Sequence, residues 1–301
     1  MNDSSQFFPD TCVRDRLLAD VRSKKDLMFL STDFILYHVN EQLRLNKKLR
    51  EFVHSTEISK LVKSKKYEEI VKYVRAKARN AYAIFQIPSL VAKRKELLES
   101  VKISDKSDGD KIVELLHSHL STKERVENYG AFFDLVVENC GKPKSVLDLA
   151  CGLNPVAYYH YADFTNSKKT QYLCNELSDL DCQQLNSFFA NNKLPASAVS
   201  FDLVREFEIL TQPPFNQKFD ICFLLKALDT LESQKLYVTY DIIKRVDAKF
   251  FVATFPNQSM SGKQMKRSAQ INWFEKMLPR LGLSFTRHEL GNEVVYICKK
   301  L

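Results

Sequence analysis

The chain has 301 residues, of which 45% are hydrophobic and 27% are charged, so it can bury one large core or two smaller ones. No apolar run reaches the roughly eighteen residues of a membrane span, and residues 1–10 lack the basic start of a signal peptide. Seven cysteines without a C-x-x-C pair indicate a reducing, cytoplasmic setting and no metal site. We expect a cytoplasmic protein that acts as a monomer.

The net charge of +8 is concentrated in the first half of the chain. Residues 1–125 hold 25 basic and 18 acidic side chains, and within residues 44–95 the numbers are 15 and 4. Such a surface attracts partners that carry phosphate, RNA among them. Charge alone supports equally a set of solvated helical faces.

From about Val13 to Leu120 apolar residues recur at intervals of three and four, which predicts helices. Lysine and arginine occupy the faces between them. The polar stretch at residues 104–110 reads as a loop or flexible linker. We therefore predict a basic helical domain over residues 1–120 that docks on RNA. Its candidate RNA-binding residues are Lys63, Lys65, Lys66, Arg75 and Arg79.

After about Ser121 short apolar runs alternate with helical stretches, which is typical of an α/β sheet protein. The first five expected strands are buried parallel strands, and the last two form an antiparallel hairpin. This predicts a doubly wound, seven-stranded domain over residues 121–301. The strands are expected at Ser145–Leu149, Gln171–Asn175, Ala198–Phe201, Phe219–Leu224, Phe250–Phe255, Ser284–Glu289 and Glu293–Cys298.

The stretch SVLDLACGLNP, residues 145–155, reads as a strand, a tight turn and the start of a helix. Gly152 lets the backbone pass close under a ligand, and Asp148 can face a cationic group. Glu176 ends the second strand, where an acid accepts from a ribose, and Asp202 ends the third, where it can accept from an adenine amino group. The G-x-G-x-x-G motif of nicotinamide enzymes is absent. These features predict S-adenosylmethionine as the cofactor.

Five segments of the sequence resemble motifs of one family. This family is the 16S ribosomal RNA guanine-N7 methyltransferases of the aminoglycoside-resistance Arm/Rmt group and their actinomycete relatives. LDLACGLNP resembles their LD(L/I)GCGLNP, and residues 119–125 resemble H-x-S-T-R-E-R. Residues 220–234 resemble LLK…LExQ. Residues 255–262 and 291–296 resemble SFPTRSLxG and GNELVY. The similarity spans roughly residues 115–300.

The resemblance implies a Rossmann-like class I methyltransferase fold behind a helical domain that docks on the 30S subunit. It implies that Arg125 binds the methionine carboxylate. It places Lys226 and Glu232 as catalytic residues at the mouth of the pocket, where a flipped guanine enters. The other cofactor-binding residues that it implies are Asp148, Ala150, Gly152, Glu176, Asp202 and Leu225.

The chain departs from the family pattern at several positions. Ala150 replaces the usual glycine, Lys123 replaces an arginine, and Asn257–Gln258 replace the threonine and arginine of SFPTRS. The last change removes a guanidinium that is expected near the RNA. It therefore concerns the target nucleotide more than the cofactor.

Guanine N7 carries a lone pair and no proton, so the predicted reaction needs alignment of a flipped base rather than a general base. Trp273 is a candidate for stacking on that base, and core packing beside Phe274 is the alternative. Lys226 either reaches the site or forms a structural salt bridge. We interpret Cys151 as a packing residue, and His119 as one that packs near Ser121.

Two other functions remain open at this point. One keeps the cofactor and changes the acceptor to another RNA base or a protein. The other is a catalytically silent ribosome-assembly factor that retains the fold. The predicted activity is methyl transfer to N7 of a decoding-site guanine of 16S rRNA, of the guanine-1405 type, which would give aminoglycoside resistance.

Overall fold

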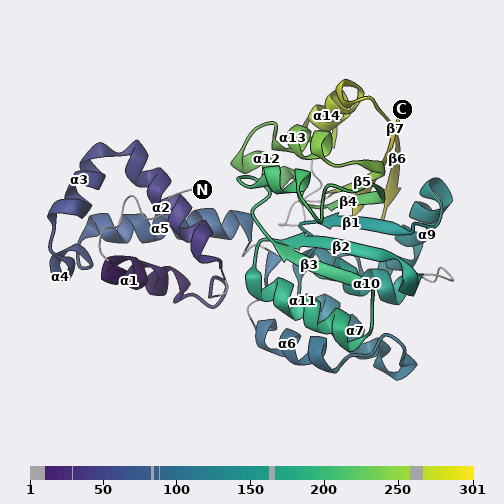
Figure 1. Ribbon diagram of the computed structural model, residues 1–301, viewed down its shortest axis with the longest axis horizontal. Helices are drawn as coiled ribbons and strands as arrows, with labels where there is room; N and C mark the ends of the chain where they lie inside the picture. The colour runs from purple at the N-terminus through teal and green to yellow at the C-terminus, as the bar shows by residue number, and fades with distance from the viewer. Residues whose placement is uncertain (1–10, 29, 83–84, 88, 163–166, 258–266) are drawn as a thin grey trace. The chain divides into compact units, whose positions relative to one another are not determined.

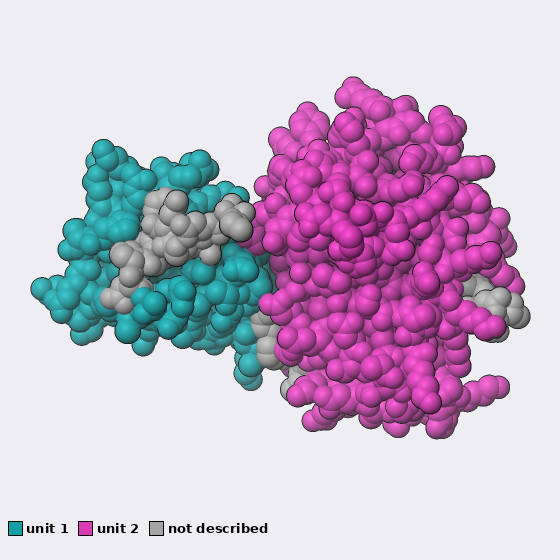
Figure 2. All heavy atoms as spheres, in the orientation of Figure 1, with its two compact units in different colours: residues 1–88 teal, residues 89–301 magenta. Residues whose placement is uncertain are grey.

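The computed structural model describes residues 11–28, 30–82, 85–87, 89–162, 167–257 and 267–301. The chain forms two compact units, residues 1–88 and 89–301, which Figure 2 colours separately. The helices that follow residue 88 thus belong with the sheet, whereas the sequence suggested a boundary after residue 120. No helix in the described part of the chain is long and apolar enough to cross a membrane.

Unit 1, residues 1–88, is helical where it is described, as the apolar periodicity predicts. Side-chain caps begin three of its helices: the oxygens of Ser31, Asn46 and Ser64 each accept a hydrogen bond from a backbone N–H three residues on. The core joins α1, α2 and α5 through buried side chains such as Leu17 and Val74. The helices are α1 (Thr11–Arg22), α2 (Thr32–Leu45), α3 (Lys47–Ser55), α4 (Ile58–Leu61) and α5 (Lys65–Ala81).

Unit 2, residues 89–301, begins with two helices that the sequence assigned to the first domain. Helix α6 (Val91–Ser100) packs on α11 (Asp179–Asn191), and α7 (Gly109–His117) packs on α10 (Asn154–Tyr161). Their apolar side chains enter the same buried cluster as those of α10 and α11. Burial of this face is the physical reason why the unit starts before residue 120.

The polar stretch at residues 104–110 is part of the fold and not the linker that the sequence suggested. It contains a short 3-10 helix, η2 (Lys106–Asp108), and leads directly into α7. The buried Asp108 carboxylate accepts hydrogen bonds from the backbone N–H of Lys102, at 2.8 Å, and from Lys111 Nζ, at 2.7 Å. These bonds fix the connection between α6 and α7.

The sheet has seven strands in the order β3-β2-β1-β4-β5-β7-β6, which confirms the predicted number. Strands β1 to β5 are parallel to one another, and β7 runs antiparallel to both β5 and β6. The predicted terminal hairpin is therefore confirmed. The strands are β1 (Ser145–Leu149), β2 (Gln171–Glu176), β3 (Ala196–Ser200), β4 (Phe219–Leu225), β5 (Ala248–Pro256), β6 (Leu283–Leu290) and β7 (Glu293–Lys300).

Two helical layers cover the sheet, one on each face (Figure 1). One layer contains α6, α7, α9 (Tyr129–Cys140), α10 and α11. The other contains α12 (Leu228–Gln234), α13 (Val238–Arg245) and α14 (Arg267–Met277). The single turns are α8 (Leu120–Lys123), η3 (Val126–Asn128), η4 (Ser167–Lys169), η5 (Phe207–Thr211) and η6 (Leu278–Leu281).

This architecture is the predicted doubly wound, Rossmann-like one. Because β1 to β5 are parallel, their carboxyl ends meet at one edge of the sheet, where ligands bind in such folds. We call this edge the carboxyl edge.

Candidate functional site

The turn after β1 combines two residues with left-handed backbone at the carboxyl edge. Ala150 has φ 53° and Gly152 has φ 52°. A Cβ atom on Gly152 would lie 2.7 Å from Cε1 of the buried His119, so glycine is required there for space as well as for conformation. Ala150 has no such freedom and holds a strained conformation. The expected turn and the helix start at Pro155, in α10, are confirmed.

Asp148 is fully buried in β1, just before this turn. Its Oδ2 accepts hydrogen bonds from Tyr172 Oη at 2.6 Å and from Asn154 Nδ2 at 2.9 Å. Its Oδ1 is buried and has no hydrogen-bond donor among the described residues. Burial raises the pKa of Asp148 to about 6, although both hydrogen bonds oppose this shift. The carboxylate is therefore held at one oxygen and unsatisfied at the other, which is the arrangement that a cationic ligand would complete.

Glu176 ends β2 and reaches across to the same turn. One oxygen accepts the backbone N–H of Gly152 at 2.9 Å, and the other accepts the N–H of Leu177 at 2.9 Å. Burial raises the pKa of Glu176 to about 7, while the backbone hydrogen bonds lower it. The two strand-end acids that the sequence singled out thus flank one turn.

Asp202 lies just past the end of β3, where its carboxylate organises the local chain. It accepts the backbone N–H of Val204 at 2.8 Å and Nε of Arg205 at 2.6 Å. Leu225 ends β4 and is buried. Both residues occupy strand ends at the carboxyl edge, as predicted.

Arg125 and Lys226 come together through a residue to which the sequence analysis assigned no role. Glu293, the first residue of β7, is 3% exposed and lies between them. Its Oε2 accepts Arg125 Nη2 at 2.7 Å and Nε at 3.1 Å, and its Oε1 lies 2.9 Å from Lys226 Nζ. Lys226 Nζ also donates to Glu124 at 2.6 Å.

These charges compensate one another inside the protein. Burial alone would raise the pKa of Glu293, yet Arg125 and Lys226 together hold it below its usual value. Of the two alternatives for Lys226, the structure shows the salt bridge. Arg125 is also tied to β5, because its Nη2 donates to Thr254 Oγ1 at 3.1 Å.

Glu232, in α12, uses both of its carboxylate oxygens to bind backbone N–H groups. Its Oε2 accepts the backbone N–H of Tyr237 at 2.7 Å, and its Oε1 accepts the N–H of Thr239 at 2.8 Å. Both oxygens thus satisfy N–H groups at the start of α13. These contacts give Glu232 a structural role at the carboxyl edge.

The remaining candidates follow the packing alternatives. Trp273 is partly buried, and its ring packs edge-on against the rings of Phe255 and Phe274, with distances between ring centres of 6.2 and 5.7 Å. Cys151 is buried, and burial raises the pKa of its thiol. His119 Nδ1 lies 2.9 Å from Ser121 Oγ, and burial lowers the pKa of its ring to about 3. Gln258 lies outside the described residues.

No cluster of three His, Cys, Asp or Glu side chains suited to a metal occurs in the described part of the chain.

The sequence did not indicate the role of Tyr172 and Asn154, which donate hydrogen bonds to Asp148. Tyr172 lies within the predicted strand at residues 171–175, and the apolar pattern of that strand gave no sign of a role for its hydroxyl group. Asn154 belongs to the GLNP segment, and its side-chain amide is a donor that could have been expected to bind the nearby Asp148.

The candidate RNA-binding residues of unit 1 divide into two kinds. Lys63, Lys65 and Lys66 are exposed, and half of the Arg79 side chain is exposed, 53%. Arg75 instead ties α5 to the end of α1, because its Nη2 donates to the backbone oxygen of Asp20 and to Ser23 Oγ. Its guanidinium therefore has a structural role.

A family model described as ribosomal RNA methyltransferase (FmrO) matches residues 68–297. The chain belongs to this family. The match covers most of α5 and most of the described part of unit 2. It therefore includes every strand end discussed above.

Curated relatives agree with this assignment. The chain is 30% identical over 184 residues to a 16S rRNA (guanine(1405)-N(7))-methyltransferase of Frankia casuarinae, covering 60% of this chain and 61% of that protein. A protein of the same name from Micromonospora echinospora is 29% identical over 185 residues, with coverages of 60% and 63%. The chain thus matches about three fifths of the length of these relatives.

The fold is also that of the 16S rRNA methyltransferase RmtF, whose crystal structure contains S-adenosyl-L-homocysteine. The TM-score is 0.74 and the identity 23%, with coverage of 97% of this chain and 99% of that one. At this identity the likeness shows the fold.

The two left-handed residues of the turn predict opposite effects of substitution. Ala150→Gly removes backbone strain and is expected to stabilise the protein by about 1 kcal/mol. Gly152→Ala adds strain and a contact with His119, and is expected to destabilise it by about 2–3 kcal/mol. Urea unfolding of the two variants beside the wild type measures both. A loss of stability in Ala150→Gly would contradict the strain at Ala150.

Asp148 predicts a pH dependence of stability in the protein without ligand. Because its folded pKa, about 6, lies above its ordinary value of 3.8, the folded state binds the proton more tightly than the unfolded state. The free energy of unfolding should therefore fall as pH rises from 4 to 6, by up to roughly 3 kcal/mol from this group. Asp148→Asn should remove that part of the slope. An unchanged slope in urea titrations at pH 4, 5 and 6 would show that Asp148 is not the group responsible.

Proposed function

We propose that this protein transfers the methyl group of S-adenosylmethionine to N7 of a decoding-site guanine of 16S rRNA, the guanine-1405 position. It acts in the cytoplasm on the assembled 30S subunit, as a monomer, and gives aminoglycoside resistance. The observation that carries the proposal is the buried Asp148 carboxylate, which has one unsatisfied oxygen beside a glycine turn in a ribosomal RNA methyltransferase family member. The names of the curated relatives support the target base.

The residues of the carboxyl edge fit S-adenosylmethionine. Asp148 Oδ1 can accept from the ammonium group of the methionine part, which would satisfy the only oxygen of this carboxylate that lacks a donor within the described ranges. The turn at Ala150 and Gly152 lets the backbone approach the cofactor closely. Glu176 stands where the ribose hydroxyls can donate, and Asp202 where the adenine amino group can. Bound there, the cofactor supplies an electrophilic methyl group.

Arg125 is proposed to bind the methionine carboxylate. Since its guanidinium already binds Glu293, the two carboxylates would share it. An arginine can do this because it carries five N–H donors in a fixed plane. Lys226 supplies a second positive charge beside Glu293. Arg125 can therefore bind the methionine carboxylate while Glu293 stays paired with a cation.

The chain's part in the chemical step is alignment. Guanine N7 has a free lone pair and loses no proton, so no side chain has to act as a general base. The protein must hold the extruded base in line with the methyl group and exclude water. We propose that Lys226, at the end of β4, faces this space as a positioning residue, held by Glu124 and Glu293.

Labelled cofactor tests the function directly. The protein is incubated with methyl-labelled S-adenosylmethionine and 30S subunits, and the label is mapped on 16S rRNA by cleavage at N7-methylguanine. One decoding-site guanine is expected to be labelled. Asp148→Asn is expected to weaken cofactor binding by about tenfold or more, because it removes the charge opposite the ammonium group. Calorimetry with S-adenosylhomocysteine measures that loss.

Three outcomes would count against the proposal. Label on naked RNA but not on 30S subunits would contradict the assembled subunit as substrate. Label at another base or on a protein would contradict the acceptor. Absence of cofactor binding to the wild type would favour a silent assembly factor.

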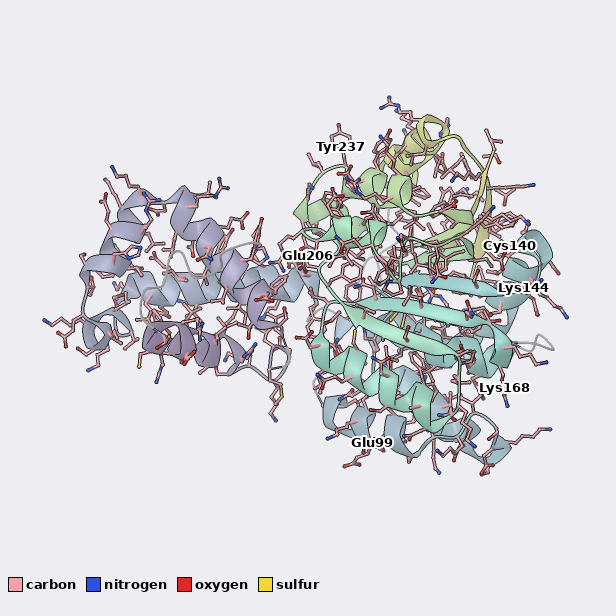
Figure 3. The ribbon with its side chains drawn as sticks, in the orientation of Figure 1. Glu99, Cys140, Lys144, Lys168, Glu206 and Tyr237 are labelled. Atoms are coloured by element: carbon pink, nitrogen blue, oxygen red, sulfur yellow. The ribbon has the colours of Figure 1, made fainter. Side chains whose placement is uncertain are left out.

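Unit 1 is proposed to dock on the subunit through its exposed lysines. Reversal of charge at Lys63, Lys65 and Lys66 should weaken 30S binding and reduce its salt dependence, by about one unit of log–log slope for each phosphate that is no longer neutralised. The matched control reverses the charge of three exposed lysines that precede β1 and β2 in unit 2, namely Lys144, Lys168 and Lys169 (Figure 3 labels the first two). If both triple variants weakened 30S binding equally, the proposed docking surface on unit 1 would be wrong.

A further inference from the structure

The loop between α12 and α13 exposes two large apolar side chains. Leu236 is 75% exposed and Tyr237 is 74% exposed. Apart from the terminal Leu301, these are the most exposed large apolar side chains in the described ranges. Figure 3 shows Tyr237 at the outer surface of unit 2. Neither side chain belongs to the two buried clusters of unit 2.

The backbone of Tyr237 is left-handed, with φ 65° and ψ 11°, a conformation that bulky residues rarely adopt. The carboxylate of Glu232 holds it there, through the N–H groups of Tyr237 and Thr239. The protein thus holds a strained conformation in order to point an aromatic ring into solvent. Strain that the surroundings enforce in this way is typical of ligand contacts.

The topology brings this loop to the carboxyl edge. Helix α13 connects β4 to β5, which are parallel, so it runs back from the carboxyl edge toward the start of β5. Its first turn, with Tyr237 directly before it, therefore opens on the same edge as Asp148 and Lys226. Under the proposed function the acceptor base is bound at this same edge.

The neighbourhood of Tyr237 suits nucleic acid. The Lys235 side chain is 44% exposed, and its Nζ lies 4.2 Å from the centre of the Phe207 ring and 4.0 Å from Asp241 Oδ2. The carboxylate of Glu232 binds backbone N–H groups, and that of Asp241 pairs with both Arg245 and Lys235. An exposed aromatic ring beside a cation is the surface on which unpaired bases stack.

We propose that Tyr237 is a stacking platform for an unpaired base of the target RNA, at the entrance to the site where the acceptor guanine is bound. This inference rests on the proposed function. It gives Glu232 its purpose, which is to fix the backbone that presents the ring. Tyr237 positions the RNA and takes no part in methyl transfer itself.

Kinetics on 30S subunits test the platform. Tyr237→Ala should raise KM for the subunit by roughly 5- to 100-fold, the range expected for loss of one base–aromatic stack, while the Kd for S-adenosylhomocysteine stays unchanged. Tyr237→Phe and Tyr237→Trp keep a ring and should keep KM within about twofold of the wild type. Leu236→Ala is the matched control for loss of exposed apolar surface, and its KM should not change.

Tyr237→Gly separates stacking from a role in the fold. Glycine relieves the left-handed strain, so this variant should resist urea better than the wild type and still show the raised KM. If Tyr237 had only a structural role, the Tyr237→Gly variant would instead lose stability in urea and activity together. Normal KM in Tyr237→Ala, or an equal defect in Leu236→Ala, would overturn the proposal.

A photocrosslink identifies the partner. With Tyr237→p-benzoylphenylalanine, irradiation of the 30S complex should attach the protein to a 16S rRNA nucleotide. Attachment to a ribosomal protein would overturn the stacking role. The wild type distinguishes failure of the proposed function from failure of the stacking role. If the wild type does not methylate 30S subunits, the proposed function is wrong. If it does, and substitution of Tyr237 leaves KM unchanged, only the stacking role is wrong.

Discussion

A carboxylate buried between two cations determines the geometry of the carboxyl edge. Glu293 comes from the last strand, Arg125 from the turn before α9, and Lys226 from the residue after β4, so one ion-pair network joins three distant parts of the chain. None of these charges tolerates burial alone, because an uncompensated ion in the interior costs several kcal/mol. Each therefore holds the other two in place, and the strand ends that they carry are held with them.

This constraint explains the antiparallel hairpin as well as the site. Pairing of β7 with β5 places Glu293 opposite Pro256, at the end of β5, and so brings a carboxylate from the last residues of the chain to the carboxyl edge. A parallel β7 would present its carboxyl end there instead. The reversed strand is thus the means by which the chain supplies an anion to Arg125. Thr254 of β5 completes the arrangement by accepting from the same guanidinium.

The sequence predicted the features that local patterns encode. Apolar runs gave all seven strands, and the acids at strand ends gave Asp148 and Glu176 at one turn. The partners of charged side chains were beyond its reach, because Glu293 lies 168 residues from Arg125 in the sequence. Glu232 shows a second limit, since its backbone partners lie only five and seven residues away. For Glu232, as for Arg75, whose guanidinium joins two helices, residue type does not distinguish a structural ion from a functional one.

The boundary of unit 2 has a consequence for how the site is built. Residues between α7 and α9 supply His119 against Gly152, Glu124 to Lys226, and Arg125 to Glu293. One wall of the site thus comes from the segment before β1, and it is positioned by the burial of α6 and α7 in the core beneath the sheet. A substitution in those helices would reach the candidate site through packing rather than through contact. The helices that periodicity alone assigned to a docking domain are therefore part of unit 2, and the basic surface proposed for docking belongs to residues 1–88.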